Sequence, residues 1–257
     1  MPKIHPSSVV SSKAQISADA EIGPFCFIED DVIIGSGTKL LNNVTVYNGA
    51  RIGENNLLFP GSVISAIPQD LKFGGEITEA VIGNNNRIRE CVTVNRGTSY
   101  SGSTIVGNNC LLMAYSHVAH DCIIGDNCIL ANSVALGGHV TLEEYTILGG
   151  LVGVHQFVKV GRHCMIGAHS MLVKDVPPFT LFSGDPLHYK GLNITGLKRR
   201  DFSSDKIELL KKVYHIIYSS GLNVTQSIEK LKKDFKQEPE IPYIISFIES
   251  SSRGISR

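Results

Sequence analysis

The stretch VGNNCLLMAYSHVAHDCIIGDNCILANSVALGGHVTLEEYTILGGLVGVHQFVKVGRHCMIGAHSML, from Val106 to Leu172, has Val, Leu or Ile at every sixth residue without interruption. A period of six matches neither the 3.6 residues of a helical turn nor the two-residue alternation of a strand, so it indicates a higher-order repeat. The positions are Val106, Leu112, Val118, Ile124, Leu130, Leu136, Leu142, Leu148, Val154, Val160, Ile166 and Leu172.

The same period extends towards the N-terminus. It runs from Ile4 to Ile64, and a short third run contains Ile82, Ile88 and Val94. The two interruptions, about residues 65–81 and 95–105, keep the six-residue phase but lose its aliphatic side chains. We therefore expect two loops that leave the repeat, and such loops commonly lie on a binding face.

The residues between the aliphatic positions favour short strands joined by tight turns. Glycine directly follows the aliphatic residue in ten hexads, as at Gly23 and Gly167, and Asn pairs such as Asn42-Asn43 tolerate a positive φ. Because the glycines recur so regularly, a role in turns is favoured over a role in cradling phosphate. The aliphatic side chains are expected to point inward and to stack, as in a parallel β-helix.

The cysteines fit the same core. Five of the six occur four residues after a repeat aliphatic, a position that otherwise selects small side chains, and there is no CxxC pair. They are expected to be small buried side chains rather than metal ligands or disulfides. The N-terminus lacks the apolar core of a signal peptide and no stretch is long enough to span a membrane, so we expect a cytoplasmic protein. The five are Cys26, Cys110, Cys122, Cys128 and Cys164.

The charges are balanced overall but unevenly placed. The 257 residues contain 24 Lys+Arg and 24 Asp+Glu, which gives no sign of nucleic-acid binding. Residues 1–175 contain 11 basic and 15 acidic side chains, whereas residues 176–257 contain 13 and 9. The basic C-terminal region suits an acidic partner; an unspecific solvated surface is the alternative.

The repeat ends at Pro177-Pro178, which divides the chain into two predicted domains. Residues 1–175 are expected to form the β-helix and residues 176–257 a C-terminal α-helical domain. Helices are predicted at Lys206–Ser219, Thr225–Phe235 and Pro242–Ser250, the first opened by a capping box of Asp205 and Glu208.

The repeat resembles that of the hexapeptide acyltransferases. The resemblance implies a left-handed β-helix, an exception to the usual right-handed crossover, in which three hexads form one triangular coil of 18 residues. Residues 4–175 would then form between nine and ten coils. A step of 18 residues puts His120, Gly138 and Gln156 at one corner of successive coils, roughly 4.8 Å apart per layer.

This column has the groups that acyl transfer needs. An imidazole can remove a proton from an attacking hydroxyl, and the backbone N–H of a nearby glycine can bind the oxyanion. Asp121, next to His120, is placed to orient the ring, and Asp121, His139 and Phe157 form the neighbouring column. These residues predict a catalytic site with His120 as general base.

Two other interpretations of the histidines remain. His117, His120 and His139 can be offered as ligands of a catalytic zinc ion, as in trimeric β-helix carbonic anhydrases, although the spacing and the C-terminal region differ from theirs. A non-catalytic scaffold or a carrier-protein-binding module would make the column a coincidence. We favour acyl transfer without a metal or other cofactor.

Several motifs narrow the resemblance to one family. PQDLKF (68–73), RIRECVTVNRGT (87–98), LLMAYSHVAHDCIIGDNCILAN (111–132), GGLVGVHQF (149–157) and GLNITGLKRRDFS (191–203) are similar to the acyl-carrier-protein-dependent UDP-N-acetylglucosamine O-acyltransferases of lipid A biosynthesis. The similarity extends, in order, over nearly the whole chain. It implies a homotrimer with sites between subunits, which moves an (R)-3-hydroxyacyl chain from the phosphopantetheine of acyl-carrier protein to the sugar 3-hydroxyl.

The resemblance also implies roles for particular residues. His120 would be the general base, Asp121 its partner and Gly138 the oxyanion donor. Side chains that close the acyl groove, here Ala168 and Met171, would set a preference short of the longest acyl chains. The residues expected to position the sugar or acyl chain are Asp70, Lys72, His117 and His139, and those expected to hold UDP are Gln156, Asn193 and Arg199.

Two positions depart from the family pattern. Asn95 stands where many members have His, and Thr195 where many have Glu, which alters polar contacts in the cleft and near the nucleoside. The second enzyme interpretation is a related N-acyltransferase acting on an amino sugar nucleotide from acyl-carrier protein or coenzyme A. The lipid A N-acyltransferase usually has an extra N-terminal domain, whereas the hexads here begin at Ile4.

Overall fold

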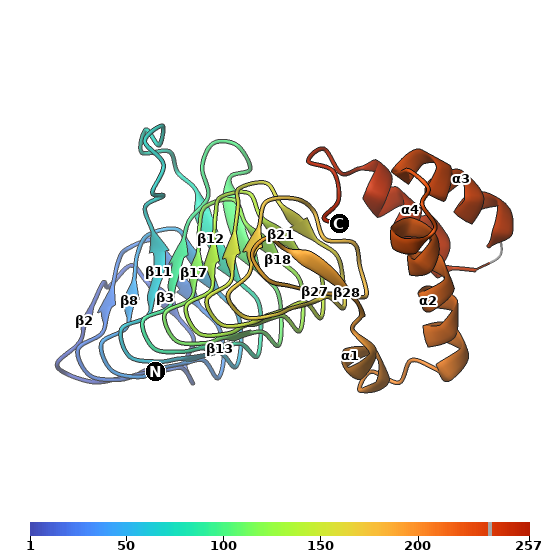
Figure 1. Ribbon diagram of the computed structural model, residues 1–257. Coiled ribbons are helices and arrows are strands. Elements are labelled where there is room, and N and C mark those ends of the chain that lie inside the picture. The colour runs from blue at the N-terminus through green and yellow to red at the C-terminus, as the bar shows by residue number, and fades with distance from the viewer. Residues whose placement is uncertain (236–237) are drawn as a thin grey trace.

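The computed structural model of the protein describes residues 1–235 and 238–257. The chain forms the predicted left-handed parallel β-helix, with a group of helices beyond its last coil (Figure 1). Each coil contributes one short strand to each of three sheets, which we call sheets A, B and C. All neighbouring strands within a sheet are parallel except the final pair, β27 and β28.

The strands of each sheet follow in spatial order. Sheet A contains β1 (Lys3–Ile4), β4 (Glu21–Ile22), β7 (Lys39–Leu40), β10 (Leu57–Leu58), β13 (Arg87–Ile88), β16 (Leu111–Leu112), β19 (Ile129–Leu130), β22 (Ile147–Leu148), β25 (Met165–Ile166), β27 (Thr180–Ser183) and β28 (His188–Leu192). Sheet B contains β2 (Val9–Val10), β5 (Phe27–Ile28), β8 (Thr45–Val46), β11 (Val63–Ala66), β14 (Thr93–Asn95), β17 (His117–Val118), β20 (Ala135–Leu136), β23 (Gly153–Val154) and β26 (Met171–Leu172). Sheet C contains β3 (Gln15–Ile16), β6 (Val32–Ile34), β9 (Ala50–Ile52), β12 (Glu79–Ile82), β15 (Ser103–Val106), β18 (Ile123–Ile124), β21 (Thr141–Leu142) and β24 (Lys159–Val160).

The coils have a triangular cross-section, so the turns gather along three edges. The chain passes from sheet A to sheet B, then to sheet C and back to sheet A. We name the three edges A–B, B–C and C–A after the sheets that they join. Within one chain, the edge on which a turn residue lies decides which other residues it can contact.

The repeat aliphatic side chains form the core, as predicted. Leu112, Leu130 and Leu148 are fully buried, and so are their counterparts in the other sheets. Ile4 is 39% exposed, because the first coil has no coil beneath it. Five of the cysteines are buried free thiols, also as predicted, and several donate S–H to a carbonyl of the next coil, as Cys122 does to Gly137 at 3.2 Å.

The glycines after the aliphatic positions serve a different purpose from the turns predicted for them. A Cβ on Gly35 would lie 2.6 Å from the backbone of Gly53 in the next coil, so glycine is needed there for close approach of two coils. The left-handed turn conformation occurs two residues later, for example at Asn55 (φ 54°). Asn43 and Asn109, each the second residue of a predicted Asn pair, also have positive φ, as expected.

Both predicted loops leave the β-helix at the B–C edge, where they project from the coils (Figure 1). The first connects β11 to β12 and the second connects β14 to β15. The pairing step in sheet A is 18 residues from Lys39 to Leu57, then 30 to Arg87 and 24 to Leu111. The loops thus add 12 and 6 residues, whole hexads, which preserves the inward direction of every later aliphatic side chain.

The C-terminal region differs from the prediction in detail. The β27–β28 hairpin was not predicted, and β27 extends sheet A one strand beyond the end of the hexad pattern. Helices α1 (Ile194–Lys198), α2 (Ser204–Ser219), α3 (Val224–Asp234) and α4 (Glu240–Glu249) follow, and α1 was also missed. The predicted capping box of α2 is wrong: Ser203 is the N-cap, and its hydroxyl accepts from Lys206 N.

The helices have a core of their own, which the last coil and the C-terminus complete. Tyr214 on α2 is fully buried, and its hydroxyl donates to Pro178 O. The carboxylate of Asp175 accepts from Lys159 N and Ser251 Oγ, which ties the chain end to the β-helix. Among the described residues, no helix has the length and apolar character needed to cross a membrane.

Candidate active site

The B–C edge contains the predicted catalytic column. His120 lies in the turn between β17 and β18, and Gly138 in the turn between β20 and β21, one coil further on. The backbone confirms this register, since His139 N donates to His120 O and Phe157 N donates to Gly138 O. Both extruded loops leave from the same edge, so the column and the loops share one surface of the chain.

His120, Asp121 and Gly138 are in close contact. His120 Nδ1 is 2.7 Å from Asp121 Oδ2, and both side chains are almost fully buried. The other side of the ring faces Gly138, where a Cβ would lie 2.5 Å from His120 Cε1 and 2.6 Å from Nε2. Within the described residues the Gly138 N–H donates to no protein acceptor. An imidazole oriented by a carboxylate thus lies beside a free backbone donor.

The Asp121 carboxylate accepts hydrogen bonds from the second loop as well as from His120. Its donors there are Thr98 N at 3.0 Å, Thr98 Oγ1 at 2.7 Å, Ser101 N at 3.3 Å and Ser101 Oγ. Burial alone would raise the pKa of Asp121, but the bonds from Ser101, His120 and Thr98 outweigh it and lower the pKa to about 2. Asp121 is therefore an anion at neutral pH.

Two further histidines flank the pair. His139 stacks on Phe157 with ring centroids 4.2 Å apart, and its buried Nδ1, 3.9 Å from Asp121 Oδ2, has no hydrogen-bond partner among the described residues. His117 lies on the outer face of sheet B, where its Nδ1 is 2.7 Å from Thr93 Oγ1. Burial lowers the pKa of both histidines, which favours neutral rings that can bind polar ligand groups.

The first loop contains Asp70 and Lys72, which were predicted to position the sugar or acyl chain. Asp70 is close enough for its charge to oppose the lowering of the pKa of His139. Its Oδ1 accepts from Lys72 N at 3.0 Å, whereas the Lys72 side chain is exposed. Asn95, the first departure from the family pattern, is buried and donates to Ile67 O, so its amide supports the base of this loop.

The residues expected to hold UDP do not come together within one chain. Gln156 is exposed on the B–C edge, one coil beyond Gly138. Asn193 Nδ2 donates to His163 O in a turn of the C–A edge, and its Oδ1 caps α1. Arg199, at the C-terminal end of α1, and Thr195 are exposed. The residues predicted to hold UDP are therefore distributed over two different edges of the triangular β-helix.

The predicted acyl-length residues lie near each other but not on one surface. Ala168 occupies an A–B turn, and Met171 is on the outer face of sheet B. The sulfur of Met171 covers Gly153, where a Cβ would lie 3.1 Å from it. His117, Ala135, Gly153 and Met171 are in register on four successive strands, so small residues separate the histidine from the methionine.

Thr98, Ser101 and Tyr100 of the second loop were not singled out from the sequence. Tyr100 packs edge-on against His139 with ring centroids 4.5 Å apart. The available signal was the run of hydroxyl side chains in TSYSGS (98–103), inside a segment already expected to lie on a binding face. The hexad numbering assigns coil residues to columns but does not place an extruded loop.

The donor groups suit acid–base chemistry better than metal binding. Among the described residues, His120, Asp121 and His139 have ligand atoms within 4.8 Å of one another. Both oxygens of Asp121 are already saturated by five hydrogen bonds, one of which uses His120 Nδ1. His117, offered with His120 and His139 as a zinc ligand set, is outside this group.

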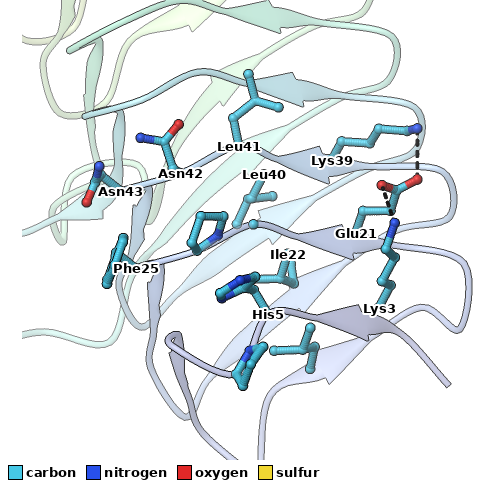
Figure 2. A pocket seen from close by; sticks show the side chains of 14 residues that line it. Lys3, His5, Glu21, Ile22, Phe25, Lys39, Leu40, Leu41, Asn42 and Asn43 are labelled. Atoms are coloured by element: carbon cyan, nitrogen blue, oxygen red, sulfur yellow. Dashed lines mark ion pairs between the residues drawn. The ribbon is translucent and has the colours of Figure 1, made fainter.

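A wide hollow elsewhere on the chain lacks these groups. Its volume is about 660 Å³, and it follows the A–B edge of the first coils, between residues 3 and 43 (Figure 2). Glu21 bridges Lys3 and Lys39 beside it, but the three side chains are exposed and such surface pairs contribute little. The hollow is mostly apolar and distant in the coil order from His120, so we do not assign the reaction to it.

Comparisons with known proteins identify close relatives. A family profile described as UDP N-acetylglucosamine O-acyltransferase, domain 2, matches residues 175–256, and a bacterial transferase hexapeptide profile matches residues 103–138. The chain is 46% identical over 258 residues to the acyl-[acyl-carrier-protein]–UDP-N-acetylglucosamine O-acyltransferase of Thermodesulfovibrio yellowstonii, covering 100% of both. The corresponding enzyme of Xylella fastidiosa is 41% identical, with 99% of this chain and 97% of the relative covered.

Comparison with solved structures gives the same family as the sequence comparison. The UDP-N-acetylglucosamine acyltransferase of Bacteroides fragilis superposes with a TM-score of 0.97 at 46% identity, covering 99% of this chain and 100% of that chain. The protein of the same name from Acinetobacter baumannii, LpxA, gives 0.96 at 42% identity, with 99% of each chain covered.

Proposed function

The chain belongs to the acyl-[acyl-carrier-protein]–UDP-N-acetylglucosamine O-acyltransferases, and on that premise we propose that His120 is the general base of the transfer. The protein is an acyltransferase. The proposed reaction moves an (R)-3-hydroxyacyl chain from the phosphopantetheine thioester of acyl-carrier protein to the 3-hydroxyl of UDP-N-acetylglucosamine, the first step of lipid A biosynthesis. No metal or other cofactor takes part in it.

The contact of His120 with Asp121 and Gly138 is the observation that carries this mechanism. His120 Nε2 removes the proton of the sugar hydroxyl as its oxygen attacks the thioester carbonyl. The Gly138 N–H binds the oxyanion, and Asp121 stabilises the imidazolium. Collapse of the intermediate forms the ester and breaks the C–S bond. The imidazolium then returns the proton to the phosphopantetheine sulfur.

The surrounding side chains position the substrates. His117 and His139 offer neutral ring nitrogens, and Asp70 and Lys72 lie on the loop above them. The acyl chain follows the outer face of sheet B from His117 over Ala135 and Gly153 towards Met171. That path is three coils, roughly 14 Å at the usual strand spacing, so Met171 and the nearby Ala168 limit the chain length.

We propose that the working enzyme is a homotrimer whose sites lie between subunits. Gln156 is on the B–C edge whereas Asn193 and Arg199 are associated with the C–A edge, so one chain alone does not surround the UDP portion. Packing the B–C edge of one copy near the C–A edge of another would complete the site, and three copies joined by this contact would close into a ring with threefold symmetry.

The outer face of sheet A supports such packing. Leu111, Ile129, Ile147, Met165 and Leu181 are in register on five successive strands, and each is partly exposed. A continuous apolar stripe of this kind is typical of a protein–protein interface. The basic balance of residues 176–257 suits acyl-carrier protein, an acidic partner, and the free thiols of all six cysteines suit the cytoplasm.

The test is turnover of UDP-N-acetylglucosamine with 3-hydroxyacyl carrier protein, with products identified by mass spectrometry and by base lability, which separates an ester from an amide. His120→Ala is expected to reduce kcat/KM by about 10²–10⁴-fold with an unchanged melting temperature. His169→Ala, which removes an exposed histidine from the A–B edge, is the matched control and keeps full activity. Wild-type activity in His120→Ala would refute the mechanism.

A further inference from the structure

The second loop folds back from β14 and concentrates its hydrogen bonds on one side chain of the catalytic column, that of Asp121. Four of the five hydrogen bonds to this carboxylate come from two loop residues, Thr98 and Ser101, each of which donates both its N–H and its hydroxyl. The Asp121 side chain is fully buried, and its own N–H donates to Thr104 Oγ1 at 2.8 Å. Apart from these four loop donors, the side-chain carboxylate accepts a hydrogen bond only from His120 Nδ1 among the described residues.

From this geometry we propose that Thr98 and Ser101 are positioning residues of the reaction, which act by fixing the Asp121 carboxylate that orients His120. The inference rests on the proposed role of His120 and adds a function for the loop. Neither residue contacts the reacting atoms in this arrangement. Each acts through Asp121, so the loop is part of the catalytic machinery and not only a rim of the substrate cleft.

The loop is itself held in place by the neighbouring coil. Gly97 N donates to Glu79 O at 3.0 Å, and Gly97 O accepts from the buried Thr78 hydroxyl at 2.7 Å. A Cβ on Gly97 would lie 2.4 Å from Ser103 N, so the two ends of the loop meet at this glycine. Thr98 therefore begins from a fixed backbone position, which is what a positioning residue needs.

The electrostatic consequence can be measured. Four donors share the negative charge of Asp121, which limits how strongly this carboxylate attracts the proton on His120 Nδ1. Removing a donor concentrates the charge towards His120 and favours the protonated ring. The acid limb of the pH–rate profile should then move to higher pH. The reason is that His120 becomes protonated, and so unable to act as a base, at a higher pH than in the wild type. A purely structural defect lowers the rate at every pH and leaves the limb in place.

The experiment compares four variants with the wild type in the same transfer assay, from pH 5 to 9, with melting temperatures measured in parallel. Thr98→Val and Ser101→Ala each remove one hydroxyl from Asp121. Thr98→Ser restores the hydroxyl at position 98. Ser99→Ala is the matched control, since this serine of the same loop is exposed and interacts with Glu76 instead.

We expect kcat/KM to fall about 10-fold in Thr98→Val and Ser101→Ala, in line with loss of one hydrogen bond to a charged group. The acid limb should rise by about half a pH unit or more, whereas Thr98→Ser and Ser99→Ala remain close to the wild type. If the wild type is active and His120→Ala is inactive, but both hydroxyl deletions match Ser99→Ala, the positioning role is wrong while the proposed function stands. An active His120→Ala would overturn the proposed function, and this inference with it.

Discussion

Gly138 is the residue that most tightly constrains His120. The ring occupies the space where any larger residue would place its Cβ, and the ring has little freedom because Asp121 and the second loop hold it. Gly138 has an ordinary negative φ, so the need for glycine is steric and not conformational. The proposed oxyanion donor and the proposed base therefore contact each other directly, so a change in one displaces the other.

Gly138→Ala is therefore expected to displace the His120 ring and to lower kcat/KM by about 10² or more, with little change in melting temperature. The added methyl leaves the N–H in place, so the loss would report on the base and not on the donor. Gly150→Ala is the matched control: Gly150 has the same hexad position two turns later, and its Cβ would be 3.5 Å from the nearest atom. Equal activity of the two variants would contradict the contact.

At this scale the sequence predicted coil residues well and loop residues poorly. The 18-residue step brought His120 and Gly138 together because both lie in uninterrupted coils. Thr98 and Ser101 lie within an insertion, so no period relates them to Asp121. Asn193 stays a predicted contact of the nucleotide, but its side chain also caps α1, a role that depends on a short helix which the sequence pattern does not reveal.

Among the elements, the outer face of sheet B determines the proposed path of the acyl chain. The side chains alternate strictly between core and exterior, so the outward residues of β17, β20, β23 and β26 form one row. The row is open over Ala135, whereas Met171 covers Gly153 and blocks the row there. A longer acyl chain would have to displace the methionine or leave the surface.

Met171→Ala is expected to shift the preference of the enzyme towards longer acyl chains. Burial of two further methylene groups stabilises a bound chain enough for a roughly 10-fold gain in relative kcat/KM. A panel of 3-hydroxyacyl carrier proteins of graded length measures this gain. Val9→Ala, which shortens an exposed outward side chain on the first strand of sheet B, should leave the preference unchanged; an identical shift in both variants would argue against the row from His117 to Met171.

The stacked turns of the C–A edge bury a histidine, His163, near the helices. His163 lies between Tyr145 and Phe179, with centroid distances of 4.9 and 5.6 Å, and its buried Nδ1 has no hydrogen-bond partner among the described residues. Burial, together with the charges of Arg200, Arg162 and Lys206, lowers the pKa of His163 to about 4. This histidine is neutral in the folded protein over most of the accessible pH range.

Stability should therefore fall as the pH drops from about 6.5 to about 4. The unfolded chain binds a proton on His163 below the ordinary histidine pKa of about 6.5, whereas the folded chain does not until about pH 4. His163→Phe keeps the ring stack and removes the titration. We expect its melting temperature to exceed that of the wild type at pH 5 by more than at pH 8. A difference independent of pH would exclude His163 as the cause.

At the scale of the whole molecule, the proposed functional residues are distributed over different edges of the β-helix. The B–C edge carries His120 and Gly138, the proposed base and oxyanion donor, and both loops, whereas α1 and Arg199 are associated with the C–A edge. The sequence predicted the β-helix and the C-terminal helices, because the hexad repeat and the helical periodicity are local signals. It did not predict the hairpin of β27 and β28, which no hexad marks. Which edges of different subunits contact each other depends on the shape and chemistry of their surfaces. The six-residue period carries no information about these surfaces.

The shared-site trimer predicts complementation between two inactive variants. Arg199→Ala removes the guanidinium expected to bind phosphate and should reduce kcat/KM by about 10–100-fold, and His120→Ala removes the base. In a ring of three, a mixed trimer has one interface that joins an intact His120 to an intact Arg199, whichever variant is present twice. Co-expression with two different affinity tags and tandem purification yields such trimers. They should recover about one third of wild-type activity, which is more than either parent retains. Activity no higher than that of the parents would place His120 and Arg199 in sites within one subunit, because mixing then restores nothing.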